Sequence, residues 1–283
     1  MSAVTALISG GHRLDHLRTR PGSLSPPDSA SRAAPAADVI FLYFAGHGKT
    51  EDGDVVLVTH DGSSESPGIR FSQVLAKIQA SQASQIIIIL DCCFAGAAGK
   101  VPALGGGTST LPPGVVIMTA SREDQTSAET SAGRGLFSTY LEGALQGGAA
   151  EVLGKITIAG IYAYLDELFG AWDQRPMLKA NVDRLEVLRT VMPSVEPAKL
   201  RELVAMFSDP YAKLDLDPSF EPTEEPRHDI NERKFSVLQD CRAAKLVEPI
   251  EEQHLYFAAM RKGTCRLTAL GRHYWLQVHK GHV

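Results

Sequence analysis

Continuous apolar runs and stretches with helical spacing of apolar residues alternate along the first two thirds of the chain. The apolar runs are 39–45, 85–91 and 115–121, and the shorter or more mixed segments 55–61 and 184–191 are further candidate strands. Apolar positions recur every three or four residues over 70–81, 135–146 and 158–169. The first pattern is typical of strands buried in a sheet, and the second is typical of amphipathic helices. Their order predicts an α/β fold with a mostly parallel sheet and helices on both faces.

Composition divides the rest of the chain into segments. Residues 1–38 are rich in Gly, Pro, Ser and Ala from residue 9 onward and predict a flexible leader, in which Val4–Ile8 is the sole candidate for a first strand. Residues 39–192 hold the predicted sheet. Residues 193–226 are rich in proline and carry eight acidic against three basic residues, which predicts a linker with one helix near Pro197–Phe207.

The C-terminal segment, residues 227–283, has its own pattern. We expect a helix over 230–247, a strand over 254–260, a turn over 261–264, a return strand over 265–267 and a final helix over 269–280. Thr268 is a favourable N-cap for that last helix. The order of helix, hairpin and capped helix resembles a small winged-helix domain of the α+β class.

Composition excludes several classes of protein. With 283 residues, 44% apolar and 22% charged, the chain is neither disordered nor collagen-like nor a coiled coil. No apolar run approaches the ~18 residues of a membrane helix. The first residues lack the positive charges of a signal peptide, so none is expected. Four cysteines, two of them adjacent, predict no disulfide framework, which favours the cytoplasm.

The net charge of −5 is unevenly distributed between the two parts of the chain. Residues 227–283 carry ten basic against six acidic residues, and the remainder carries 18 against 27. An acidic body followed by a mildly basic C-terminal segment indicates two modules with different partners.

Reactive side chains follow two of the most apolar runs. His47, between Gly46 and Gly48, comes directly after the run 39–45. Asp91, Cys92 and Cys93 end or follow the run 85–91. Open α/β sheets place their sites at the C-terminal ends of strands. His47 alone is equally typical of a polar turn, and Cys92 of a small core residue pointing back into the protein.

Five ordered stretches resemble the caspase and metacaspase superfamily of peptidase C14 type. They are FLYFAGHG (41–48), LVTHD (57–61), IIIILDCCFAG (86–96), VVIMTASREDQTSAE (115–129) and GLFSTYLEGAL (135–145). The resemblance implies a cysteine endopeptidase with His47 as general base and Cys93 as nucleophile. It also implies that the backbone N–H groups of Gly48 and Cys93 face the developing oxyanion.

The same resemblance implies that the substrate pocket selects cations. Asp91 and Asp61 match metacaspase pocket acids, and Asp124 matches an acid near that pocket. Carboxylates that share a cleft favour an arginine or lysine before the scissile bond. Asp61 is also compatible with a plain turn, and Asp124 with an exposed loop. Lys100 is the one basic residue in the loop 96–114, and we expect any self-cleavage there, although an uncut enzyme is the alternative.

No cofactor and no metal site are expected. Gly62 stands where a further calcium-binding acid would help, and the C-terminal histidines lack ligand spacing for zinc. We expect protein substrates and a regulatory protein partner for the C-terminal segment, with no membrane and no nucleic acid; structural capping is an alternative role for that segment. By analogy, the role would be that of an effector in a prokaryotic conflict or cell-death system. The alternatives are a catalytically silent scaffold and a winged-helix nucleic-acid-binding regulator.

Overall fold

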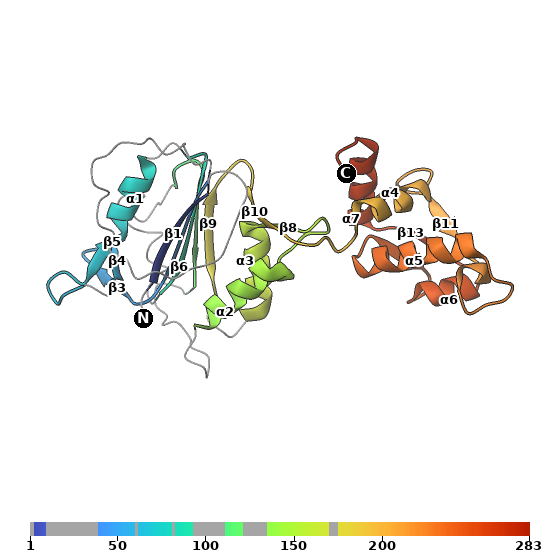
Figure 1. The fold of residues 1–283 in the computed structure, drawn as a ribbon, viewed down its shortest axis with the longest axis horizontal. Helices are drawn as coiled ribbons and strands as arrows, with labels where there is room; N and C mark the ends of the chain where they lie inside the picture. The colour runs from blue at the N-terminus through green and yellow to red at the C-terminus, as the bar shows by residue number, and fades with distance from the viewer. Residues whose placement is uncertain are drawn as a thin grey trace. The chain divides into compact units, whose positions relative to one another are not determined.

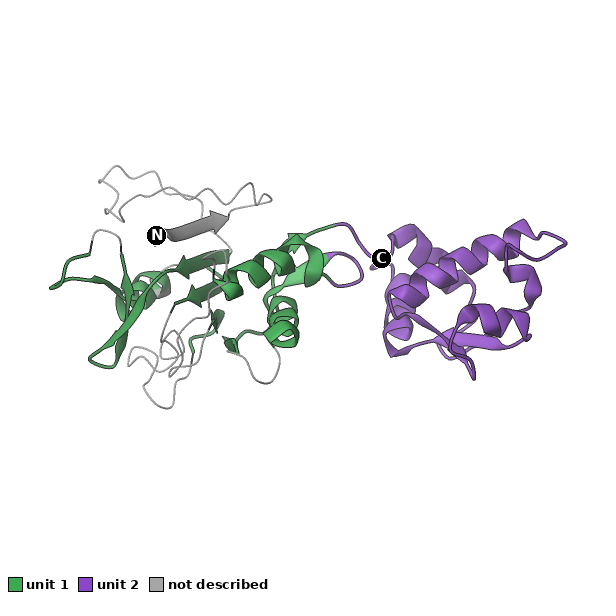
Figure 2. Ribbon diagram, turned by 90° about the horizontal axis from the view of Figure 1, so that it is seen from below, with its two compact units in different colours: residues 1–150, 155–191 green, residues 151–154, 192–283 purple. Residues whose placement is uncertain are grey.

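The chain divides into two compact units. The computed structural model describes residues 3–9, 39–59, 62–80, 83–92, 111–120, 135–169 and 175–283. Unit 1 comprises Met1–Ala150 and Lys155–Val191, and unit 2 comprises Glu151–Gly154 and Met192–Val283 (Figure 2). Within the described residues, no helix is both long and apolar enough to cross a membrane.

A five-stranded sheet forms the centre of unit 1 (Figure 1). In spatial order its strands are β1 (Ala3–Ser9), β2 (Val39–Ala45), β6 (Gln85–Asp91), β7 (Val115–Thr119) and β9 (Met177–Asn181). The three central strands β2, β6 and β7 are parallel, whereas the edge strands β1 and β9 are antiparallel to their neighbours. The sheet is therefore parallel at its centre, as predicted, and antiparallel at both edges.

Helices cover both faces of this sheet, on opposite sides in Figure 1. Ile86, Ile88 and Leu90 of β6 belong to one buried cluster with Phe71 and Leu75 of helix α1 (Phe71–Gln79). Because successive side chains of a strand point to opposite faces, the intervening residues of β6 belong to a second cluster.

The second cluster joins Ile87 and Ile89 to α2 (Leu136–Gly143) and α3 (Ile158–Phe169). A π-helical turn, η4 (Ala144–Gly148), continues α2. All seven residues of β6 are buried, in agreement with its continuous apolar run. The predicted α/β fold with helices on both faces is confirmed.

Two predicted strands pair outside the main sheet. The run 55–61 forms β4 (Asp54–Val58), which lies between β3 (Gly48–Glu51) and β5 (Gly68–Arg70) in a separate antiparallel sheet. The run 184–191 forms β10 (Val187–Thr190), which pairs with β8 (Lys155–Thr157). The last strand of the main sheet is β9, whose mixed polar sequence predicted no strand.

The expected leader contains a strand. The candidate Val4–Ile8 lies within β1, which pairs along its whole length with β2, from Ala3 opposite Ala45 to Ser9 opposite Val39. The rest of the expected leader, residues 10–38, lies outside the described residues.

Unit 2 begins earlier than the sequence predicted. The elements are α4 (Pro197–Ala205), β11 (Lys213–Asp215), η5 (Pro218–Phe220), α5 (Asp229–Ala243), β12 (Val247–Ile250), α6 (Leu255–Met260), β13 (Thr264–Leu267) and α7 (Ala269–His279). The expected linker 193–226 is wrong as a separate segment, because Leu200, Leu203 and Phe220 lie in the same buried cluster as α5 and α7.

The expected strand over 254–260 is also wrong, because these residues form α6. Leu255, Ala258 and Ala259 are buried and follow helical spacing, so that a helix buries all three on one side. The partner strands of β13 are β11 and β12, in the order β11-β13-β12. The hairpin on which the winged-helix resemblance depended is therefore replaced by strand, helix and strand.

Candidate functional site

Two sequence motifs meet where β2 and β6 end. The strands are parallel and in register, with Ala45 opposite Asp91. One residue beyond the strand, the backbone N–H of Gly46 donates to the carbonyl oxygen of Asp91 at 3.1 Å. The turn that carries His47 is thus fixed directly to the residue that precedes the two cysteines. His47 itself is exposed.

A hairpin fixes the other side of the same turn. The carbonyl oxygen of His47 accepts a hydrogen bond from the backbone N–H of Val58 at 3.0 Å, and Gly48 lies opposite Leu57. Hydrogen-bonded and non-hydrogen-bonded pairs alternate in an antiparallel ladder. The bond at His47 therefore makes Gly48 and Leu57 a non-hydrogen-bonded pair, in which the N–H of Gly48 points away from β4.

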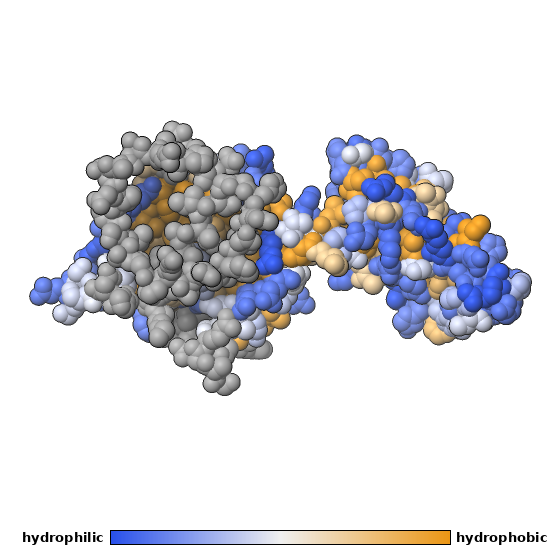
Figure 3. Space-filling model, in the orientation of Figure 1, coloured by the Kyte–Doolittle hydropathy of each residue, from blue (hydrophilic) through white to orange (hydrophobic). Residues whose placement is uncertain are grey.

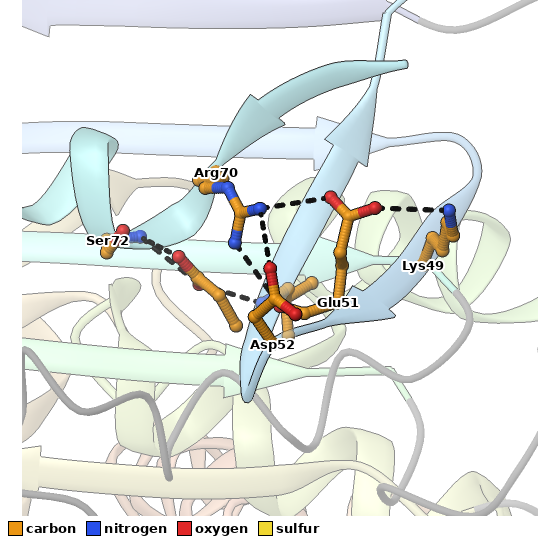
Figure 4. A network of polar contacts seen from close by, with 7 residues as sticks. Lys49, Glu51, Asp52, Arg70 and Ser72 are labelled. Carbon is orange, nitrogen blue, oxygen red and sulfur yellow. Dashed lines mark hydrogen bonds and ion pairs between the residues drawn. The ribbon is translucent and has the colours of Figure 1, made fainter. Parts of the chain in front are cut away.

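The tip of this hairpin is a two-residue turn. Asp52 and Gly53 have positive φ values of 51° and 77°, which are the values of a type I′ turn and explain the Asp-Gly sequence. The Arg70 guanidinium lies 3.2 Å from the carboxylates of both Glu51 and Asp52 (Figure 4). These contacts connect the turn to β5.

Asp54 connects the same hairpin to helix α1. Its buried carboxylate accepts hydrogen bonds from the backbone N–H of Val55 at 2.7 Å and of Ser72 at 3.3 Å (Figure 4). Because Ser72 lies in the first turn of α1, Asp54 satisfies an N–H group that the helix itself leaves unpaired.

Asp91, whose carbonyl oxygen is bonded to the turn that carries His47, is buried, with 6% of its surface exposed. The Ser138 hydroxyl donates to its Oδ2 atom, and the Tyr43 hydroxyl lies 2.6 Å from the same Ser138 oxygen. Burial raises the pKa of the Asp91 carboxyl, while hydrogen bonds from the Ser138 side chain and backbone act in the opposite direction. Gly135 leaves room for this carboxylate, since a Cβ there would lie 3.1 Å from Oδ2.

Cys92 is a core residue. It is 0% exposed and belongs to the cluster that lies against α1. This agrees with the expectation of a small apolar side chain that points back into the protein. It leaves Cys93 as the remaining thiol of the motif.

Four of the expected site residues, Cys93, Asp61, Lys100 and Asp124, lie outside the described residues. In the part of the chain that the structure describes, no group of three or more His, Cys, Asp or Glu side chains could hold a metal ion.

Sequence reasoning missed Tyr43 and Ser138. A tyrosine in a strand and a serine in a helix are ordinary there and carry no motif. Gly135, the first residue of the predicted helix, was the one available signal that something approaches closely at that point.

Comparisons with known proteins indicate the family of the chain. A family model described as the caspase domain matches residues 28–185. A solved structure of caspase-1 from Spodoptera frugiperda is similar at 13% identity and a TM-score of 0.33, covering 53% of this chain and 63% of that one. The chain thus spans less than two thirds of that caspase. A search of curated proteins found no match.

Proposed function

Because the chain belongs to the caspase-domain family, we propose that it is a cysteine endopeptidase in which His47 is the general base and Cys93 the nucleophile. The observation that carries this proposal is the register of β2 and β6. Ala45 lies opposite Asp91, and Gly46 is hydrogen-bonded to Asp91, so the residues that follow each strand start from adjacent positions.

The proposed reaction follows ordinary thiol chemistry. The His47 imidazole takes the Cys93 thiol proton, and the thiolate adds to the carbonyl carbon of the scissile bond. The C–N bond then breaks as the imidazolium returns the proton to the amine, and water hydrolyses the thioester. The outward direction of the Gly48 N–H supports its proposed role, with the N–H of Cys93, as an oxyanion donor.

We propose that the pocket takes an arginine or lysine side chain before the scissile bond. The buried Asp91 carboxylate supports this, because a buried carboxylate without a cationic partner is costly and an incoming guanidinium supplies that partner. Asp61 and Asp124 remain proposed as further acids of the same pocket.

For unit 2 we propose recruitment of a regulatory protein, and the winged-helix resemblance stays a prediction. Large apolar side chains are exposed on its mixed surface (Figure 3): Met192, Tyr211, Ile230, Tyr256, Phe257, Leu270 and Leu276. A cleft in the same unit is lined by Arg201, Val204, Ala205, Phe207, Val278 and His279. Such features fit a protein partner better than nucleic acid, which would need a denser basic patch. A cytoplasmic role in a prokaryotic conflict or cell-death system remains a proposal by analogy.

A panel of fluorogenic peptides tests the proposed peptidase activity. We expect cleavage after Arg or Lys, abolished by Cys93→Ala or His47→Ala, with Cys92→Ala as the matched control that keeps most activity. Asp91→Ala should reduce cleavage after Arg about 30-fold or more through loss of a buried charge partner. Intact-mass spectrometry of the same samples tests the expected self-cleavage after Lys100.

Two results would contradict the proposal. Cleavage only after Asp would overturn the basic specificity while leaving a cysteine peptidase. No cleavage of any peptide would favour the catalytically silent scaffold.

A further inference from the structure

The Asp91 carboxylate is held by hydroxyl groups from two neighbouring elements. Ser138, in the first turn of α2, donates to Oδ2, and Tyr43 of β2 lies within hydrogen-bond distance of Ser138. A serine hydroxyl has a single proton. Since Ser138 gives that proton to Asp91, its oxygen accepts from the Tyr43 hydroxyl, and the three residues form a directed chain from Tyr43 through Ser138 to Asp91.

This chain has the direction that supports a negative charge. Each hydroxyl donates toward the carboxylate, which is the arrangement that a carboxylate prefers and a protonated carboxyl does not require. Gly135 completes the arrangement, because any larger residue there would press against Oδ2. Asp91 is thus both desolvated and held in one orientation.

The elements around Asp91 are α2, β7 and β2. None of the described titratable groups on them takes the place of Ser138 as the donor to the Asp91 carboxylate. On α2, Tyr140 packs against the Phe169 ring at 5.2 Å, and Glu142 accepts a hydrogen bond from Gln146. No titratable residue lies on β7. The residue that follows Asp91 in the sequence is the buried Cys92. His47 follows β2 beyond the strand end. Among the described residues, no basic side chain forms an ion pair with Asp91.

We propose that Ser138, held in place by Tyr43, is the positioning residue that fixes the charge and orientation of Asp91 and thereby sets how strongly the pocket selects a cationic side chain. This inference rests on the proposed function. It adds two residues, from β2 and α2, to the determinants of specificity.

The expected signature is a pH dependence. Only the ionised Asp91 attracts a cation, and loss of the Ser138 donor raises the pKa of this carboxyl further. Cleavage after Arg should then require a higher pH. For Ser138→Ala we expect about a 10-fold or greater loss of kcat/KM near neutral pH and an acid limb displaced upward by about one pH unit.

The experiment measures pH profiles of kcat/KM on an arginine peptide for the full chain. Ser138→Thr, which keeps a hydroxyl, should restore most of the selectivity, and Tyr43→Phe should shift the limb in the same direction by less. Thr139→Val is the matched control, because the Thr139 hydroxyl lies in the same turn but donates to the carbonyl oxygen of Gly135. It should leave the acid limb in place.

A second readout separates this inference from the proposed function. In the Cys93→Ala background, an NMR titration of side-chain carboxyls, assigned through Asp91→Asn, should show Asp91 titrating at higher pH when Ser138 is alanine. An active enzyme whose acid limb and carboxyl titration are unchanged in Ser138→Ala would overturn the inference alone. A wild-type chain that never cleaves after Arg or Lys would overturn both. Circular dichroism confirms that each variant is folded.

Discussion

At the scale of single residues, three of the four cysteines share a buried setting. Cys92, Cys241 and Cys265 are buried, and burial raises the pKa of the thiols of Cys241 and Cys265 to about 12 each. A thiol stays protonated below its pKa, and the protonated thiol is a poor nucleophile. Cys241 and Cys265 are therefore protected in the native protein by burial and protonation, and Cys92 is protected by its burial.

We expect iodoacetamide at pH 7.5 to modify Cys93 first in the folded chain, and the other three cysteines only after denaturation. Peptide mapping by mass spectrometry measures the order. His47→Ala should slow the modification of Cys93 without exposing the other thiols. Faster labelling of Cys92 than of Cys93 would contradict the assignment of the nucleophile.

The sequence was informative about individual site residues only where they followed a strongly apolar run. Asp91 ends one such run and His47 follows another, and the sheet register places Ala45, two residues before His47, opposite Asp91. Tyr43 and Ser138 are 95 residues apart, and their contact depends on how α2 packs on the sheet. No local pattern encodes a contact of that kind.

At the scale of elements, burial on both faces made the central strands predictable. β6 is apolar from Ile86 to Leu90 because helices cover both of its sides. β9 lies at an edge and contains Lys179 and Asn181, so its sequence has no comparable run. The apolar sequence of 254–260 fits a strand as well as a helix, and the burial of Leu255, Ala258 and Ala259 is what decides for the helix.

The N-cap of α7 is an element that the sequence predicted and the structure confirms. The Thr268 hydroxyl oxygen accepts from the N–H of Gly271 at 3.0 Å and donates to the carbonyl oxygen of Lys245 at 2.7 Å. Thr268→Ala should lower the free energy of unfolding of unit 2 by about 1 kcal/mol, or roughly 5 °C in its melting midpoint.

Fluorescence of Trp275, whose indole N–H donates to the carbonyl oxygen of Phe207, reports this transition. Thr268→Ser should retain most of the stability. Thr223→Ala is the matched control, since the Thr223 hydroxyl donates an exposed hydrogen bond to the Glu221 carboxylate at 3.4 Å. Equal destabilisation by the two alanine variants would refute the capping role.

At the scale of the whole molecule, the chain crosses between its two units more than once. Residues 151–154 lie between two elements of unit 1 but belong to unit 2. Val152 is 9% exposed in the unit 2 cluster, and its carbonyl oxygen accepts from the N–H of Ser194 at 3.0 Å. A boundary drawn only at residue 192, as composition suggested, would leave this segment out.

Val152→Ala should therefore destabilise unit 2, although Val152 precedes the rest of that unit by about forty residues in the sequence. We expect a loss of about 1–2 kcal/mol from the buried methyl groups, measured by the Trp275 transition. Val187→Ala removes the same atoms from a side chain in unit 1 that is 45% exposed, and should leave that transition unchanged. If neither variant changes the midpoint of the Trp275 unfolding transition, Val152 does not contribute to the stability of unit 2.

The parallel pairing of β2 with β6 also determines how late in folding the proposed peptidase activity would arise. Forty-six residues separate the proposed base from the proposed nucleophile, and α1 with the second sheet lies between them in the chain. Parallel strands need such a long connection between them, and pairings between segments distant in the chain form slowly during folding. On a nascent chain the proposed base and the proposed nucleophile therefore stay far apart until β2 and β6 pair. The proposed activity would arise late in folding and would be lost when these two strands separate.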